Sequence, residues 1–159
     1  MSGLLAALTL VTLVGCALSA GVFFAFSGFV MKALGRLPAA EGIAAMKAIN
    51  VAAVSFAFML ALFGTAAACL ALGGWALTGL GQPYAPYLLA GSALYLAGAI
   101  VPTIAYHVPR NEALARVEPG VEAAGQWRRY LTGWTAWNHL RAAAPAAAVA
   151  VLAWGLHLG

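Results

Sequence analysis

Residues 134–156, WTAWNHLRAAAPAAAVAVLAWGL, decide the fold of this chain. The segment begins with the polar side chains of Asn138, His139 and Arg141 and then stays apolar, apart from Pro145, to its end. Its length suits a helix that crosses a lipid bilayer, because about 20 apolar residues span a hydrocarbon core of about 30 Å. Ionisable residues in such a helix are costly and usually face a bundle interior or a wet cavity, so they indicate a functional site.

Three other apolar runs of similar length precede this segment, over residues 4–31, 49–75 and 84–106. The chain has 159 residues, of which 64% are hydrophobic and 8% are charged, and its mean hydropathy is +0.93. A soluble domain carries about 25% charged residues. The sequence therefore predicts an all-α fold: an integral membrane four-transmembrane-helix bundle that forms a single domain over residues 1–159, with short amphipathic connections on the cytoplasmic side.

The basic residues outside the four runs lie in two of the three connections. Three lie in or next to the first connection, namely Lys32, Arg36 and Lys47. Four lie in the third connection, namely Arg110, Arg116, Arg128 and Arg129. Because Lys and Arg are retained on the cytoplasmic side, both of these connections are expected to be cytoplasmic and both termini external. We expect a bacterial inner membrane protein surrounded by lipid. The net charge of +4 belongs to these connections, so no nucleic-acid partner is predicted.

The two cysteines, Cys16 and Cys69, lie inside apolar runs and are expected to be buried thiols rather than a disulfide scaffold. Residues 13–16, LVGC, resemble a bacterial lipoprotein cleavage site. No basic segment precedes them and the apolar run continues well beyond Cys16, whereas a cleavable signal has a short apolar region. We therefore predict an uncleaved first span.

Proline residues and capping residues predict how the connections fold. Pro38 begins a helix that is expected to run through Asn50 into the second span. Pro109 is expected to end the third span, with Asn111 as the N-cap of a short surface helix that stops at Pro119. Residues 121–131 then form a separate interfacial piece before the fourth span.

Small residues in the first span recur four positions apart, as Gly15 with Ser19 and Gly21 with Ala25. This spacing lets helix backbones approach closely in lipid. It predicts a tightly packed first helix and leaves open a homo-oligomer.

The polar start of the fourth span divides into two helical faces. At 100° per residue, Trp134, Trp137, Asn138 and Arg141 share one face, whereas His139 points elsewhere. Because the spans alternate in direction, these residues meet the other polar side chains at the cytoplasmic ends of the helices. Cationic groups and hydrogen-bond donors beside aromatic rings suit a flat, hydrophobic aromatic or quinone-like molecule with an anionic or phenolic oxygen.

Four segments carry a resemblance to a known family. They are residues 21–27 (GVFFAFS), 46–50 (MKAIN), 108–112 (VPRNE) and 134–141 (WTAWNHLR). Together with the four spans, they resemble the anthrone oxygenase-like family of small membrane proteins, whose characterised members oxidise polyketide anthrones to anthraquinones with molecular oxygen. The resemblance implies a cofactor-independent monooxygenase, an oxidoreductase that uses molecular oxygen as co-substrate.

The resemblance also assigns roles to side chains. His139 or His107 would remove a proton from the substrate, and Arg141 would hold the resulting oxyanion. The residues expected to bind substrate are Asn138, Arg110, Asn50, Trp134, Trp137, Phe26, Tyr106 and Asn111. No motif for a redox cofactor is present in the sequence, and a metal held by His107, His139 and Glu112 is a weaker alternative.

Two other classes of function remain open. In the first, the protein is a non-enzymatic quinone- or lipid-binding accessory or assembly protein, in which Asn138 and Arg141 join helices or anchor headgroups. In the second, it is a transporter, although the external half of the spans offers almost no polar side chain to line a path.

Overall fold

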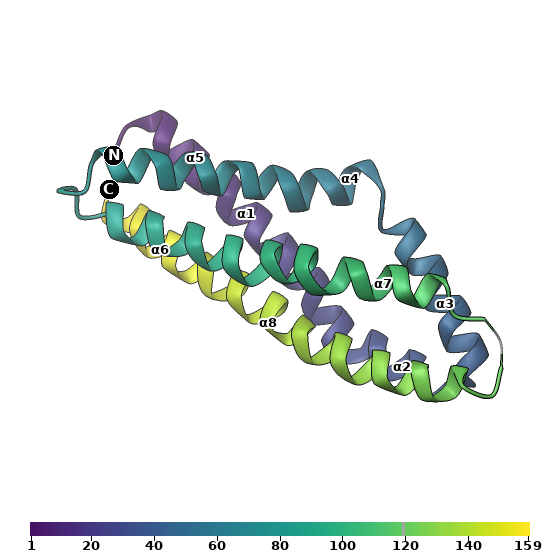
Figure 1. The fold of residues 1–159 in the computed structure, drawn as a ribbon. Coiled ribbons are helices and arrows are strands. Elements are labelled where there is room, and N and C mark those ends of the chain that lie inside the picture. The colour runs from purple at the N-terminus through teal and green to yellow at the C-terminus, as the bar shows by residue number, and fades with distance from the viewer. Residues whose placement is uncertain (119) are drawn as a thin grey trace.

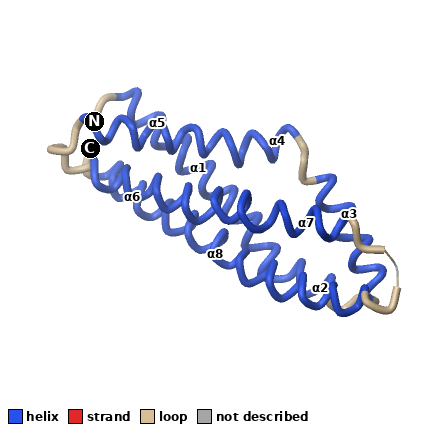
Figure 2. Tube along the Cα trace, viewed as in Figure 1, coloured by secondary structure: helices blue, strands red, loops and turns tan. Residues whose placement is uncertain are grey.

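The computed structural model describes residues 1–118 and 120–159, and those residues form helices and connections without any strand (Figure 2). Four helices are long and apolar enough to cross a membrane. They are Gly3–Leu34, Phe56–Thr78, Ala85–Ala115 and Ala123–His157. The predicted all-α, four-helix membrane bundle is confirmed.

Three of the four spans change from α-helix to π-helix along their length. The first comprises α1 (Gly3–Ala25), a π-helical turn at Phe26–Val30 and α2 (Met31–Leu34). The second comprises α4 (Phe56–Met59), a π-helical turn at Leu60–Gly64 and α5 (Thr65–Thr78). The third comprises α6 (Ala85–Tyr95), two π-helical turns at Leu96–Ile100 and Thr103–His107, and α7 (Val108–Ala115). The fourth span is the single helix α8 (Ala123–His157), and α3 (Ala39–Ala52) stands apart from the spans.

The spans lie side by side, and the connections gather at the two ends of the bundle (Figure 1). Both termini lie at one end, where the amino group of Met1 donates to the carbonyl of Gly159 at 2.8 Å. α3 and the connection between α7 and α8 lie at the other end. Lys47 joins them there, because its ammonium group donates to the carbonyl of Val117 at 2.8 Å. Helix α8 packs against α1, α3, α6 and α7, so it contacts the first and third spans and the helix at the end of the bundle.

The half of the bundle nearer the termini is a packed apolar core. Cys16 and Cys69 are fully buried there and are not joined in a disulfide, as predicted. Gly15 allows α1 to approach the second span closely, because a β-carbon at that position would overlap the hydroxyl oxygen of Thr65. Gly21 has no such neighbour within 4 Å. Of the two predicted small-residue motifs, the one with Gly15 therefore lies at a helix contact.

The predicted start of the second span was wrong. Helix α3 ends at Ala52, the chain turns at Ala53–Ser55, and α4 begins at Phe56. The Ser55 hydroxyl accepts from the backbone N–H of Phe58 at 3.3 Å and so caps the new helix. Residues 49–52 are apolar except for Asn50, but they belong to α3, which lies at the end of the bundle.

The third span is longer than predicted. Pro109 does not end it, because the helix runs on through α7 to Ala115. The missing N–H of this proline falls directly after the π-helical turn at Thr103–His107. Asn111 is therefore inside α7 and is not an N-cap. Residues 123–131 form the first turns of α8 rather than a separate piece. The expected stop at Pro119 lies outside the described residues.

Candidate functional site

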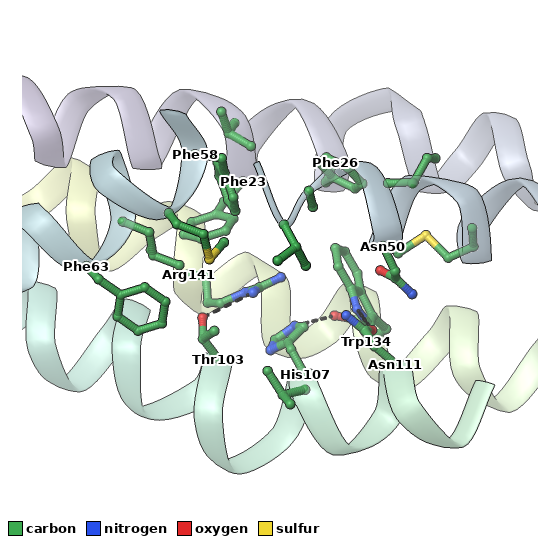
Figure 3. Close-up of a pocket in the computed structure, with 18 residues that line it drawn as sticks. Phe23, Phe26, Asn50, Phe58, Phe63, Thr103, His107, Asn111, Trp134 and Arg141 are labelled. Atoms are coloured by element: carbon green, nitrogen blue, oxygen red, sulfur yellow. Dashed lines mark hydrogen bonds between the residues drawn. The ribbon is translucent and has the colours of Figure 1, made fainter. Parts of the chain in front are cut away.

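A cavity of about 200 Å³ lies between the four spans near the α3 end of the bundle (Figure 3). Its wall is mostly apolar, and its polar lining residues are Asn50, Thr103, His107, Asn111 and Arg141. Three of the four π-helical turns contribute to the wall, and such turns are often found at functional sites. Helix α3 closes the cavity with Met46 and Ile49.

Arg141 extends from α8 to the cavity wall and is only 5% exposed. Its Nε and Nη2 donate to the Asn138 Oδ1 at 3.2 and 2.8 Å, and its Nη1 donates to the Thr103 hydroxyl at 3.2 Å. The guanidinium carbon lies 4.3 Å from the centre of the Phe23 ring and 5.0 Å from that of Trp134. A guanidinium has five N–H groups, so two remain without a protein acceptor in residues 1–118 and 120–159.

No carboxylate balances the charge of Arg141. The chain has four acidic residues, Glu41, Glu112, Glu118 and Glu122, and all four are exposed. A buried cation without a counter-ion is unfavourable in an apolar interior. The cavity therefore favours a ligand that brings a negative charge, or develops one, beside Arg141.

Asn138 lies behind Arg141 and is fully buried. Its Nδ2 donates to the Phe23 carbonyl and to the Ser27 hydroxyl, both at 2.7 Å. Its Oδ1 accepts both bonds from Arg141. The side chain therefore positions the guanidinium against the first span and does not itself line the cavity.

His107 lies between Arg141 and the indole of Trp134 on the cavity wall (Figure 3). Its Nδ1 is 3.0 Å from the Pro102 carbonyl oxygen, and its Nε2 is 3.3 Å from the Trp134 carbonyl oxygen. A neutral imidazole has one N–H, so it can donate to one of these carbonyls and keeps a lone pair on the other nitrogen. A protonated ring could donate to both.

Asn111 lies one helical turn beyond His107, at the end of the cavity near Asn50 (Figure 3). Its Oδ1 accepts from the Tyr130 hydroxyl at 2.7 Å and from the Trp134 Nε1 at 3.0 Å. An indole N–H can only donate, so the atom that faces it must be the oxygen of the amide. This fixes the orientation of the amide and leaves its NH₂ group free.

One known protein family matches this chain. A family model of anthrone oxygenases matches residues 52–151. The chain belongs to the anthrone oxygenase family. The resemblance to this family that the sequence shows is therefore confirmed. The matched residues include His107, Asn111, Trp134, Asn138 and Arg141. No curated protein and no solved structure matches the chain.

Several of the expected site residues of this anthrone oxygenase family member come together at the cavity. They are His107, Arg141, Asn50, Asn111, Trp134 and Phe26. His139 is exposed on another side of α8, in a groove with Lys32 and Thr135, as its helical angle predicted. The assignment of its role stays a prediction, but it cannot reach a ligand in the cavity from that position.

Three further expected residues form a separate stack outside the cavity. Tyr106 lies 5.2 Å from the Trp137 ring, centre to centre, and the Arg110 guanidinium carbon lies 5.2 Å from the centre of the Tyr106 ring. Trp137 is 45% exposed. It shares a helical face with Trp134, as expected, but Tyr106 holds it at the outer surface, where aromatic and Arg side chains suit a membrane interface.

The predicted site residues leave out some lining residues, chiefly Phe23, Phe58 and Thr103. Their spacing indicates two of them. Thr103 lies four residues before His107, and Phe23 lies four residues before Ser27, so each shares a helical face with a polar residue. The alternative metal set is not brought together, and the described residues contain no group of three His, Cys or acidic side chains that could hold a metal.

Proposed function

We propose that this protein is an oxygenase that converts a flat anthrone-type phenol into a quinone, with molecular oxygen as the oxidant. The observation that carries this proposal is Arg141, a buried cation with no carboxylate partner and two free N–H groups on the wall of an apolar cavity. Membership in the anthrone oxygenase family supports the reaction class.

The reaction can be written with the residues that line the cavity. An anthrone carries a ketone and, across its central ring, an acidic methylene group. His107 takes one methylene proton, and the negative charge moves to the ketone oxygen, where Arg141 holds it. The ring carbon then gives two electrons to molecular oxygen and forms a C–O bond, and the resulting peroxide takes a proton back from His107. Loss of the second methylene hydrogen with cleavage of the O–O bond releases water and leaves the second carbonyl.

The overall reaction is therefore anthrone plus oxygen to anthraquinone plus water. The substrate supplies all the electrons, so the reaction as proposed requires no redox cofactor. We assign the base to His107 rather than His139, because His107 lines the cavity and His139 lies in a different groove.

A second candidate is the binding of a quinone or lipid without turnover. One observation favours it: Val54, a lining residue of the cavity, is 73% exposed on the surface of the bundle, and Phe63, another lining residue, is also exposed. An apolar ligand could enter there from the bilayer. Turnover separates the two candidates, because the binding protein would hold the ligand without oxidising it.

The test uses the purified full chain in detergent, with an anthrone under air or argon, and follows the absorbance of the quinone. We expect oxygen-dependent turnover above the detergent blank. His107→Ala should lower kcat by at least about 100-fold, and Arg141→Gln by a similar factor. His139→Ala is the matched control and should leave the rate close to that of the wild type. Rates no higher than the blank for several anthrones would contradict the oxygenase and leave the binding candidate.

A further inference from the structure

The cavity presents free hydrogen-bond donors at two separate places. At the first, Arg141 has two N–H groups without a protein acceptor in the described part of the chain. At the second, the Asn111 NH₂ group has no acceptor in residues 1–118 and 120–159, and the bonds from the Tyr130 hydroxyl and the Trp134 indole fix which amide atom is the oxygen. Both residues line the cavity.

Two of the acceptors beside these donors, the Thr103 hydroxyl and the Asn111 oxygen, are already in use. The Thr103 hydroxyl donates to the Ala99 carbonyl at 2.7 Å and accepts from Arg141. The Asn111 oxygen accepts two bonds. A ligand that reaches both places must therefore offer an acceptor oxygen to each of them.

The two donors lie at different heights along the bundle. Thr103, which contacts Arg141, and Asn111 are eight residues apart on one continuous span, which corresponds to no more than about 12 Å along the helix axis, because part of that stretch is the π-helical turn at Thr103–His107, whose rise per residue is smaller. In Figure 3, Asn111 lies toward the Asn50 end of the labelled residues, Arg141 lies between that end and Phe63, and His107 lies between Arg141 and Asn111. A molecule with carbonyls on opposite edges of one ring, and a hydrogen bond of about 2.9 Å at each end, spans a comparable distance.

We infer that the cavity holds a para-quinone by both carbonyl oxygens, one at Arg141 and the other at Asn111. A compound with a single ketone satisfies the Arg141 end alone. If the proposed oxygenase reaction is correct, on which this assignment of oxygens rests, Arg141 holds the oxygen inherited from the ketone and Asn111 holds the oxygen that is added. Asn111 then makes the site selective for the product over the substrate.

The experiment measures binding rather than turnover. The full chain in detergent is titrated under argon with anthraquinone, which has two opposed carbonyls, and with fluorenone, which has one ketone and no acidic C–H. Quenching of tryptophan fluorescence reports the dissociation constants. We expect the wild type to bind anthraquinone about tenfold more tightly than fluorenone, as one additional hydrogen bond allows.

Asn111→Asp is the variant that tests the role of the Asn111 NH₂ group most specifically. It keeps an oxygen for Tyr130 and Trp134 but replaces the free NH₂ group with a second oxygen. We expect it to remove the preference for anthraquinone and to leave the affinity for fluorenone nearly unchanged. Arg141→Gln should weaken the binding of both compounds.

Two results would overturn the inference: equal affinities of the wild type for the two compounds, or an equal loss of affinity for both in Asn111→Asp. The comparison of anthraquinone and fluorenone binding to the wild type tests the inference even if Asn111→Asp does not fold. Selective quinone binding without anthrone turnover would refute the proposed oxygenase and keep this inference, whereas turnover without selective binding would do the opposite.

Discussion

Asn138 is the residue on which the geometry of the site depends. Its amide joins α8 to the first span through the Phe23 carbonyl and the Ser27 hydroxyl, and its oxygen accepts two bonds from Arg141. All of these groups are buried. Because these groups are buried, removal of the amide leaves several of them without their protein partners.

Replacement of Asn138 tests this role. Asn138→Leu has a similar volume but no hydrogen-bonding group, and we expect it to lower the free energy of unfolding by about 1–3 kcal/mol. The measurement is an unfolding titration in mixed micelles. His139→Leu changes the adjacent but exposed side chain and should change stability by less than about 0.5 kcal/mol. Equal effects of the two substitutions would show that Asn138 does not organise the site.

Part of this residue-scale geometry could be predicted from the sequence. The three-residue spacing of Asn138 and Arg141 places them on one face, and both are buried on the same side of α8. The position of Trp137 could not be predicted, because it depends on a ring from another span. Helical angles give directions within one helix, whereas the partners of a side chain depend on how the helices pack.

At the scale of helices, the π-helical turns and the break before Ser55 shape the cavity. The break was missed because residues 49–54, INVAAV, are as apolar as the span that follows. Hydropathy alone cannot separate an apolar turn of α3 from the start of a membrane helix. Ser55 was the available signal, since a serine before an apolar run suits an N-cap. The existence of four spans was predictable because length and hydropathy determine it.

Because α1 packs closely against the second span at Gly15, we expect a substitution of this glycine to lower stability. A β-carbon there would overlap the Thr65 side chain, so Gly15→Ala should lower the free energy of unfolding by about 1–3 kcal/mol through overpacking. Gly21→Ala is the matched control in the same helix, because nothing lies within 4 Å of its β-carbon. Thermal unfolding in detergent measures both. If Gly21→Ala proved as harmful as Gly15→Ala, Gly21 would have to face a contact outside the single chain.

At the scale of the whole molecule, charge divides the two ends of the bundle. Arg141 apart, every charged residue of the chain lies near α3 or the connection between α7 and α8. The end that holds both termini has no Lys, Arg, Asp or Glu. This asymmetry predicts that the α3 end is cytoplasmic and that the cavity lies in the cytoplasmic half of the bilayer.

Labelling of single cysteines tests that orientation. Gly81→Cys lies in the connection between α5 and α6, and Glu118→Cys lies in the connection between α7 and α8, and both positions are exposed. The native Cys16 and Cys69 are fully buried and should not react. The measurement uses spheroplasts, whose inner membrane is intact. A membrane-impermeant maleimide should label Gly81→Cys at once and Glu118→Cys only after the inner membrane is permeabilised.

The opposite pattern of labelling would place the cavity in the external half of the membrane. The substrate of the proposed reaction would then have to approach Arg141 from outside the cell, and an anthrone made in the cytoplasm would first have to cross the bilayer. With the predicted orientation, an apolar substrate made inside the cell dissolves in the nearer leaflet and meets the exposed edge of the cavity at Val54. The orientation of the chain thus decides from which side the substrate arrives.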